Sequence, residues 1–384
     1  MNRARVRSLA LTAIVVVVVA AIAMALILVA GADPLVGLRG LVEGVSSSPY
    51  RVGELLVGAV PVAIVALTLV PALRAGVFSV GAEGQVVVGA IAATAATFGM
   101  RGALGDAAPA PAYWLVGAVA GALGGALFAL LPAWLAARWG VNVILSTLLL
   151  NYVASGSLGW TLRTWLASPE NTATPQSDAL PAAAALPDLL PGTRAHVGVL
   201  LVVVAVVVFE LWRRSRHATR VRVFAERPAL ARRLGATRTR TVLTTMLVSG
   251  AGAGVVGWMQ VAGVNDRLLG SVSGGVGFSG LAVALLGGLL PVGIAAAAVF
   301  FSALAVGAVG MQSATGTVPS SIADVIKGVL LLGVAVVAAT RPGLVAPAHA
   351  AAAPPPDDGA LGADETAGAL AASGEPVIAE EARA

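Results

Sequence analysis

The chain has 384 residues, of which 58% are hydrophobic and only 11% are charged, and its mean hydropathy is +0.91. Soluble globular proteins carry about 25% charged residues, so this composition excludes an ordinary water-soluble domain. The net charge of +5 does not indicate nucleic-acid binding, because most of the positive charge lies between apolar segments, as in membrane proteins. The absence of cysteine excludes a disulfide framework and a thiolate metal site.

Apolar segments of membrane-spanning length recur along the chain. A spanning helix needs about 20 apolar residues at a rise of about 1.5 Å each. Ten segments approach this length and predict an all-α, polytopic bundle of about ten transmembrane helices. They are residues 8–30, 52–73, 81–98, 112–137, 141–166, 196–212, 241–263, 276–290, 292–312 and 322–339. Only Pro291 separates the eighth and ninth, so a broken or re-entrant helix is the alternative for that pair.

The distribution of arginine predicts how these spans are oriented. Arginines precede the first span, which places the N-terminus in the cytoplasm, and ten alternating spans return the C-terminus to that side. The first span exceeds the roughly 7–15 apolar residues of a secretory signal, which favours a retained helix over a cleaved signal. Loop 213–240 then lies inside with ten arginines, whereas segment 167–195 lies outside with one.

The composition changes abruptly after Arg341. Residues 342–384 consist mainly of Ala, Pro, Gly, Asp and Glu, and such a segment cannot bury enough apolar surface to offset its ordering entropy. We therefore predict a transmembrane domain over residues 1–341, with a cytoplasmic loop at 213–240, followed by a disordered acidic cytoplasmic tail over 342–384.

A carboxylate flanked by glycines marks the start of the third span. The sequence there is Gly81-Ala82-Glu83-Gly84-Gln85, and such polar groups are costly inside a membrane. Glycines permit close backbone approach or a break in the helix, which favours an element that lines or gates a pathway. Equally consistent with these residues is a helix start near the interface, where a solvated Glu83 stabilises the positive end of the helix dipole.

A polar stripe runs along the fifth span. Asn142, Ser146, Thr147 and Asn151 recur at helical spacing, so they lie near one face of the predicted helix. Such a face contacts either a neighbouring helix or a translocation pathway. Interhelical hydrogen bonding is the favoured interpretation for Ser146 and Thr147.

The arginine-rich loop contains a pattern typical of a short helix. Pro228 occupies a position favoured in the first turn, and Gly235 stands where a helix commonly ends. The pattern predicts an amphipathic helix of roughly two turns over residues 226–235, held at the cytoplasmic surface.

Several chemical motifs are absent. The one lysine, Lys327, lies in the last span, so no G-x-x-x-x-G-K-[ST] loop exists and nucleotide-driven work must come from another polypeptide. The sequence contains no catalytic, metal-binding or cofactor-binding arrangement in a suitable setting. Asp324 and Lys327 are expected to form a structural ion pair. Small-residue repeats such as Gly117-x-x-x-Gly121 and Gly250-x-Gly252-x-Gly254 indicate close helix packing.

These motifs resemble those of membrane permease subunits of ABC importers, in the superfamily for branched-chain amino acids, simple sugars and nucleosides. Residues 81–85 resemble a Gly-x-Glu-Gly-Gln motif, and 142–152 resemble Asn-Glu-Val-Ile-x-Thr-x-Met-Leu-Asn-Tyr, as in the nucleoside group served by basic-membrane-protein lipoproteins. The loop pattern resembles that family's coupling helix. Further matches at 280–287, 311–312 and 318–326 extend the resemblance from about residue 50 to 340.

The resemblance implies alternating access in a bacterial plasma-membrane complex with a cytoplasmic ATPase, a second homologous permease in a heterodimer and an extracytoplasmic binding lipoprotein. A polar substrate then needs pathway groups that offset its desolvation, and the candidates are Glu83, Gln85, Asn142 and Asn151. The residues implied for coupling to the ATPase are Glu226, Pro228, Leu230, Arg232, Leu234 and Gly235.

The chain also departs from the family pattern. Ser79, Val143 and Arg227 stand where the family has Asn, Glu and Asn, and Lys327 stands where Gln is common. These differences weaken the substrate assignment, so a simple-sugar or branched-chain amino acid permease is the nearest alternative. An ion-coupled secondary transporter, with Glu83 or Asp324 as the coupling carboxylate, is the alternative from another class, ahead of a channel or scaffold subunit.

Overall fold

The computed structural model describes residues 17–18, 21–105, 108–168, 174–233, 235, 237–322, 324–329 and 333. Over these residues the chain is helical and has no strand, with β-bridges only as isolated pairs. This confirms the all-α prediction. The predicted tail at 342–384, most of the last span and the beginning of the first span lie outside the described residues.

Most helices follow one another with short connections, except for the long segment between residues 161 and 201. After a helix at Ala21–Val29, the α-helices are α2 (Pro34–Ser46), α3 (Pro49–Arg74), α4 (Ala82–Leu104), α5 (Ala110–Trp139), α6 (Val143–Thr161), α7 (Leu201–Arg214), α8 (Arg216–Glu226), α9 (Pro228–Arg233), α10 (Arg238–Gln260), α11 (Val276–Leu286) and α12 (Pro291–Thr315). Two 3-10 helices, η2 (Ala182–Ala184) and η3 (Val197–Leu200), precede α7, and a π-helical turn, η4 (Val261–Asn265), continues α10.

Six described helices are long and apolar enough to cross a membrane, or seven if Ala21–Val29 and α2, bent by 109°, form one span. The six are α3, α4, α5, α6, α10 with η4, and α12. The number of candidate spans among the described residues is therefore smaller than the predicted ten. The eighth predicted span is shorter than expected, because α11 has 11 residues and the chain turns at Gly287.

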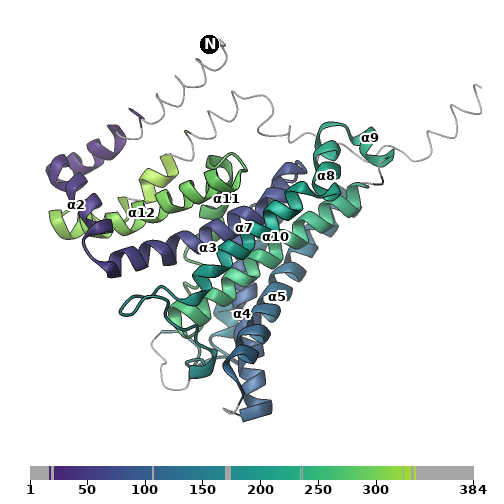
Figure 1. The fold of residues 1–384 in the computed structure, drawn as a ribbon, viewed down its shortest axis with the longest axis horizontal. Coiled ribbons are helices and arrows are strands. Elements are labelled where there is room, and N and C mark those ends of the chain that lie inside the picture. The colour runs from purple at the N-terminus through teal and green to yellow at the C-terminus, as the bar shows by residue number, and fades with distance from the viewer. Residues whose placement is uncertain are drawn as a thin grey trace, which may run out of the picture.

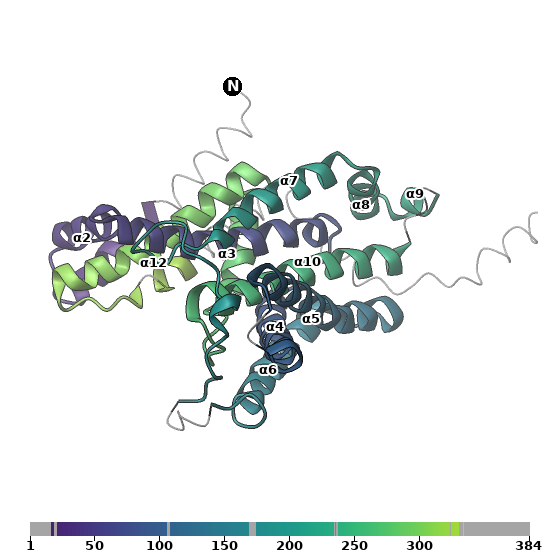
Figure 2. The same cartoon turned by 60° about the horizontal axis from the view of Figure 1, so that its bottom comes forward.

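Helix α3 lies between two groups of helices. Helices α4, α5 and α10 lie on one side, and α2, α11 and α12 lie on the other (Figure 1). Helix α3 packs directly against α10 in the first group and against α2, α11 and α12 in the second. Figure 2 shows α6 against α4, away from α2 and α12. A Cβ at Gly121 or Gly254 would meet backbone of the facing helix, so glycines allow α5 and α10 to approach closely. This confirms the packing predicted from the small-residue repeats.

The two polar loops lie at opposite ends of the long helices (Figure 1). Helices α8 and α9 lie near the start of α10, whereas segment 174–196 packs at its far end, where the Leu186 N–H donates to the Ala262 carbonyl at 2.8 Å. This separation agrees with the charge pattern. Which end faces the cytoplasm stays a prediction.

The short helix predicted in the arginine-rich loop is present but differs at its beginning. Glu226 ends α8, and α9 begins at Pro228, so the prediction of one helix over 226–235 is wrong there. The reason is local, because Pro228 disfavours helical backbone at Arg227, which has φ −143° and ψ 78°. Gly235 has a positive φ of 76°, as expected after a helix. Leu234 lies outside the described residues, as do the side chains of Pro228 and Arg232.

Candidate functional site

Glu83 joins two helices that are distant in sequence. It lies in the first turn of α4, yet its carboxylate accepts the Gly275 N–H at 3.1 Å and the Gly277 N–H at 2.8 Å. Glu83 therefore caps the N-terminal end of α11. A carboxylate at this end also interacts favourably with the helix dipole.

Helix α11 is a half-length helix that begins inside the bundle. Its 11 residues extend for about 16 Å, which is about half of a hydrocarbon core of 30 Å. Gly274 and Gly275 precede it with φ of 51° and 76°, a conformation that glycine adopts without strain. Beyond its other end, the Leu289 carbonyl accepts a hydrogen bond from the Arg74 guanidinium at 2.9 Å. Both flanks are thus held by polar partners, as irregular backbone would require inside a membrane.

The polar stripe of α6 holds the segment that leads into α4. The Thr147 hydroxyl oxygen accepts the Val80 N–H at 3.2 Å. The Asn151 amide donates to the Val80 carbonyl at 3.0 Å and accepts the Gly84 N–H at 2.9 Å. The interhelical bond is therefore made between Asn151 and Gly84 of α4, whereas Thr147 bonds the segment before α4. The Ser146 hydroxyl donates to the Val143 carbonyl within its own helix, so the prediction of interhelical bonding is wrong for Ser146.

The other two pathway candidates also have partners within the protein. Asn142 is exposed and caps α6, since its side chain accepts the N–H groups of Ile144 and Leu145 at 2.9 and 3.4 Å. Gln85 is buried and accepts a hydrogen bond from the Ser249 hydroxyl of α10 at 3.5 Å. The four candidates therefore do not line one space. Their part in transport stays a prediction.

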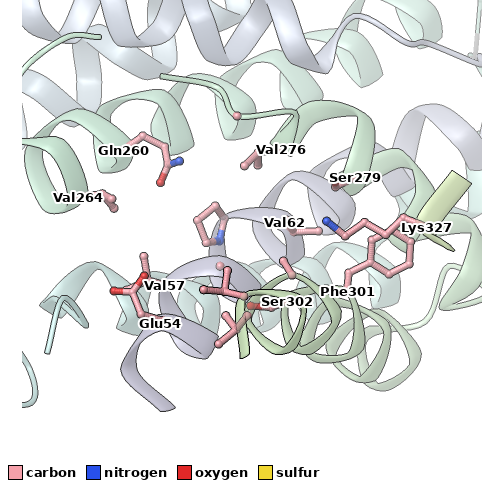
Figure 3. A pocket seen from close by; sticks show the side chains of 16 residues that line it. Glu54, Val57, Val62, Gln260, Val264, Val276, Ser279, Phe301, Ser302 and Lys327 are labelled. Atoms are coloured by element: carbon pink, nitrogen blue, oxygen red, sulfur yellow. The ribbon is translucent and has the colours of Figure 1, made fainter. Parts of the chain in front are cut away.

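A cavity of about 320 Å³ lies between α3, the α10–η4 end, α11 and α12 (Figure 3). Most of its wall is apolar, and Val57, Val62 and Phe301 belong to it. The polar side chains of the wall come from five separate parts of the chain: Glu54, Gln260, Ser279, Ser302 and Lys327.

Two acceptor atoms of this wall have no partner among the described residues. They are the Oε1 atoms of Glu54 and Gln260, both buried. The other carboxylate oxygen of Glu54 lies 3.5 Å from Nη1 of Arg194, whose Nη2 donates to the Val264 carbonyl at 3.1 Å. Arg194 thus connects α3 with η4 at the edge of the cavity. π-Helical turns such as η4 are frequent at functional sites.

Lys327 reaches the cavity from the segment after α12 (Figure 3). Its ammonium group lies 3.1 Å from the Asp324 carboxylate, which confirms the predicted ion pair. The Lys327 side chain is 19% exposed, whereas the Asp324 side chain is 78% exposed. The ion pair therefore extends from the cavity to the surface of the chain.

Glu83 lies outside the cavity but positions part of its wall. It binds the amides of Gly275 and Gly277, and the residues beside them, Gly274 and Val276, line the cavity. Glu54 and Gln260 were missed in the sequence. A carboxylate inside a predicted span, next to Gly53, was a signal for Glu54, but neither Glu54 nor Gln260 belongs to a recognised motif.

Comparisons with known proteins agree on one family. Residues 51–335 match the family described as "Branched-chain amino acid transport system / permease component". The glucose ABC transporter permease TsgB13 of Haloferax volcanii is 32% identical over 80% of this chain and 81% of its own length. The guanosine ABC transporter permease NupP of Bacillus subtilis is 30% identical over 80% of this chain and 88% of its own length. The nucleoside ABC transporter permease NupB of Lactococcus lactis is 27% identical over 81% of this chain and 86% of its own length. No solved structure matches.

Proposed function

We propose that this chain, which belongs to the permease component family of branched-chain amino acid transport systems, imports nucleosides. As an ABC transporter permease it is a multi-pass membrane protein and a subunit without enzymatic activity. The nucleoside substrate is supported by similarity, over at least 80% of the chain, to relatives named for guanosine and for nucleosides.

A sugar is the second candidate, because the relative named for glucose is 32% identical to this chain. Both substrate classes carry several hydroxyl groups, so both need acceptors along the pathway. The motifs at 81–85 and 142–152, which resemble the nucleoside group, favour the first candidate.

In the proposed mechanism an extracytoplasmic lipoprotein delivers the nucleoside, and a cytoplasmic ATPase binds α9. The chain pairs with a second, homologous permease in a bacterial plasma membrane. Closure of the ATPase moves α8 and α9, and the bundle switches between outward-open and inward-open states. The break at α11, held by Glu83, gives the bundle a half-length helix that can tilt separately from α10 and α12.

Uptake by the reconstituted complex tests the substrate. Proteoliposomes with the ATPase, the partner permease and the lipoprotein should accumulate labelled guanosine only with ATP, and excess adenosine should compete. Competition by glucose, with no effect of adenosine, would instead establish the sugar. Uptake that follows an ion gradient without the ATPase would support a secondary transporter.

A further inference from the structure

We propose that the cavity between α3, η4, α11 and α12 is a binding site for a neutral, hydroxyl-bearing ligand of nucleoside size, held by Glu54 and Gln260. The proposal rests on the proposed function, because the cavity would be a stopping point on the route of that substrate. Neither residue belongs to the motifs on which the family resemblance rests.

Size and wall chemistry suit a small organic ligand. The cavity volume of about 320 Å³ falls within the range of about 300–1,000 Å³ that is usual for ligand pockets. Such pockets combine apolar walls with few polar groups, as here, where Val57, Val62 and Phe301 surround the polar side chains. An aromatic base or the apolar face of a sugar can pack against the Phe301 ring.

The unpartnered Oε1 atoms of Glu54 and Gln260 indicate that the ligand carries hydrogen-bond donors. Glu54 and Gln260 extend from different helices toward the same space (Figure 3), and Oε1 of each is buried without a donor among the residues that the structure describes. Buried polar atoms in native proteins are nearly always paired, so two such acceptors in one cavity indicate an absent donor. Ligand hydroxyl or amine groups would donate to both.

The charges of the cavity favour a neutral ligand. Arg194 lies against the outer oxygen of Glu54, and Asp324 pairs with Lys327. Each charge already has its counter-charge, so the site does not require an ion. A ligand phosphate near Glu54 would face a carboxylate, and we expect the site to take nucleosides in preference to nucleotides.

Cysteine protection tests occupancy without relying on transport. The chain has no cysteine, so Ser279→Cys places a single thiol in the cavity wall. In the assembled complex, guanosine should slow its reaction with N-ethylmaleimide at least about tenfold, and guanosine monophosphate should not. Ser313→Cys, on the exposed surface of α12, is the control and should react equally with or without guanosine.

A second change tests the acceptor. Gln260→Leu in the Ser279→Cys background removes Oε1 at similar volume, and the guanosine concentration for half-protection should rise about tenfold. Gln312 is an exposed residue of α12 outside the cavity, so Gln312→Leu should leave the guanosine concentration for half-protection unchanged.

Transport and protection separate the two proposals. Guanosine uptake by the wild type without protection of Ser279→Cys would overturn the cavity site and leave the proposed function intact. Protection by glucose alone, with glucose uptake, would support the cavity and overturn the nucleoside assignment. No protection by guanosine, adenosine or glucose would overturn the cavity site whatever the uptake result.

Discussion

Replacing Glu83 with Gln tests whether this side chain positions α11. Gln keeps the length but has one acceptor oxygen, so its NH₂ group would face the N–H of Gly275 or Gly277. The variant loses a hydrogen bond to a charged group, about 1.5–3 kcal/mol, and a charge–dipole interaction of about 0.3–1 kcal/mol. Because Glu83 is only partly buried, we expect a loss of about 2 kcal/mol in the anchoring of α11.

Hydrogen exchange measures this loss directly. A loss of about 2 kcal/mol raises the open fraction of a locally opening segment about thirtyfold, since 1.4 kcal/mol is tenfold. Amides of residues 275–280 should therefore exchange about thirtyfold faster in Glu83→Gln. The same variant should take up less guanosine than the wild type. Glu43→Gln is the matched control, because Glu43 forms an exposed ion pair with Arg39 that contributes about 0.3–0.5 kcal/mol.

Unchanged exchange at residues 275–280 together with wild-type uptake would refute the reasoning. Faster exchange with normal uptake would preserve the anchoring role but remove Glu83 from the transport mechanism. In that case the α6 residues that hold the start of α4, above all Asn151, become the better candidates.

Three further predictions follow from the loops and the packing. Leu230→Asp on the exposed face of α9 should abolish ATP-driven uptake, whereas the control Thr219→Asp on α8 should retain it. Normal uptake by Leu230→Asp would contradict the role of α9 in coupling to the ATPase. Ala179→Cys should react with an impermeant maleimide in intact cells, and Thr219→Cys only after lysis; the reverse pattern would overturn the orientation. Gly254→Ala should destabilise the purified chain by about 1–3 kcal/mol in thermal unfolding, because its Cβ would meet facing backbone, whereas Gly156→Ala in open space should be neutral or stabilising.

Much of the helix pattern was readable from the sequence, because length and apolarity set the spans and polar residues cap them. Ser48, Asn142 and Thr237 each accept a backbone N–H at the start of a helix, close to where the apolar segments begin. Helix α8 was not predicted, since an arginine-rich segment carries no apolar signal of spanning length.

The end of α11 and the cavity could not be predicted in the same way. Residues 276–290 are apolar apart from Ser279, yet the chain turns at Gly288 and Leu289, which have positive φ of 63° and 59°. The turn is stabilised in part by Arg74, which is far away in sequence. Glu54 and Gln260 likewise meet only in the folded chain, and no local spacing relates them.

The two interpretations of Glu83 that the sequence left open turn out to be compatible. One was a helix break beside a pathway, and the other was a carboxylate that stabilises the positive end of a helix. Glu83 does stabilise such an end: it lies in the first turn of its own helix, α4, and its carboxylate caps the N-terminal end of α11. A helix that begins inside the bundle exposes unpaired N–H groups, and these need an acceptor from another helix. The carboxylate supplies this acceptor for the N–H groups of Gly275 and Gly277, and the backbone that it holds forms part of the cavity wall.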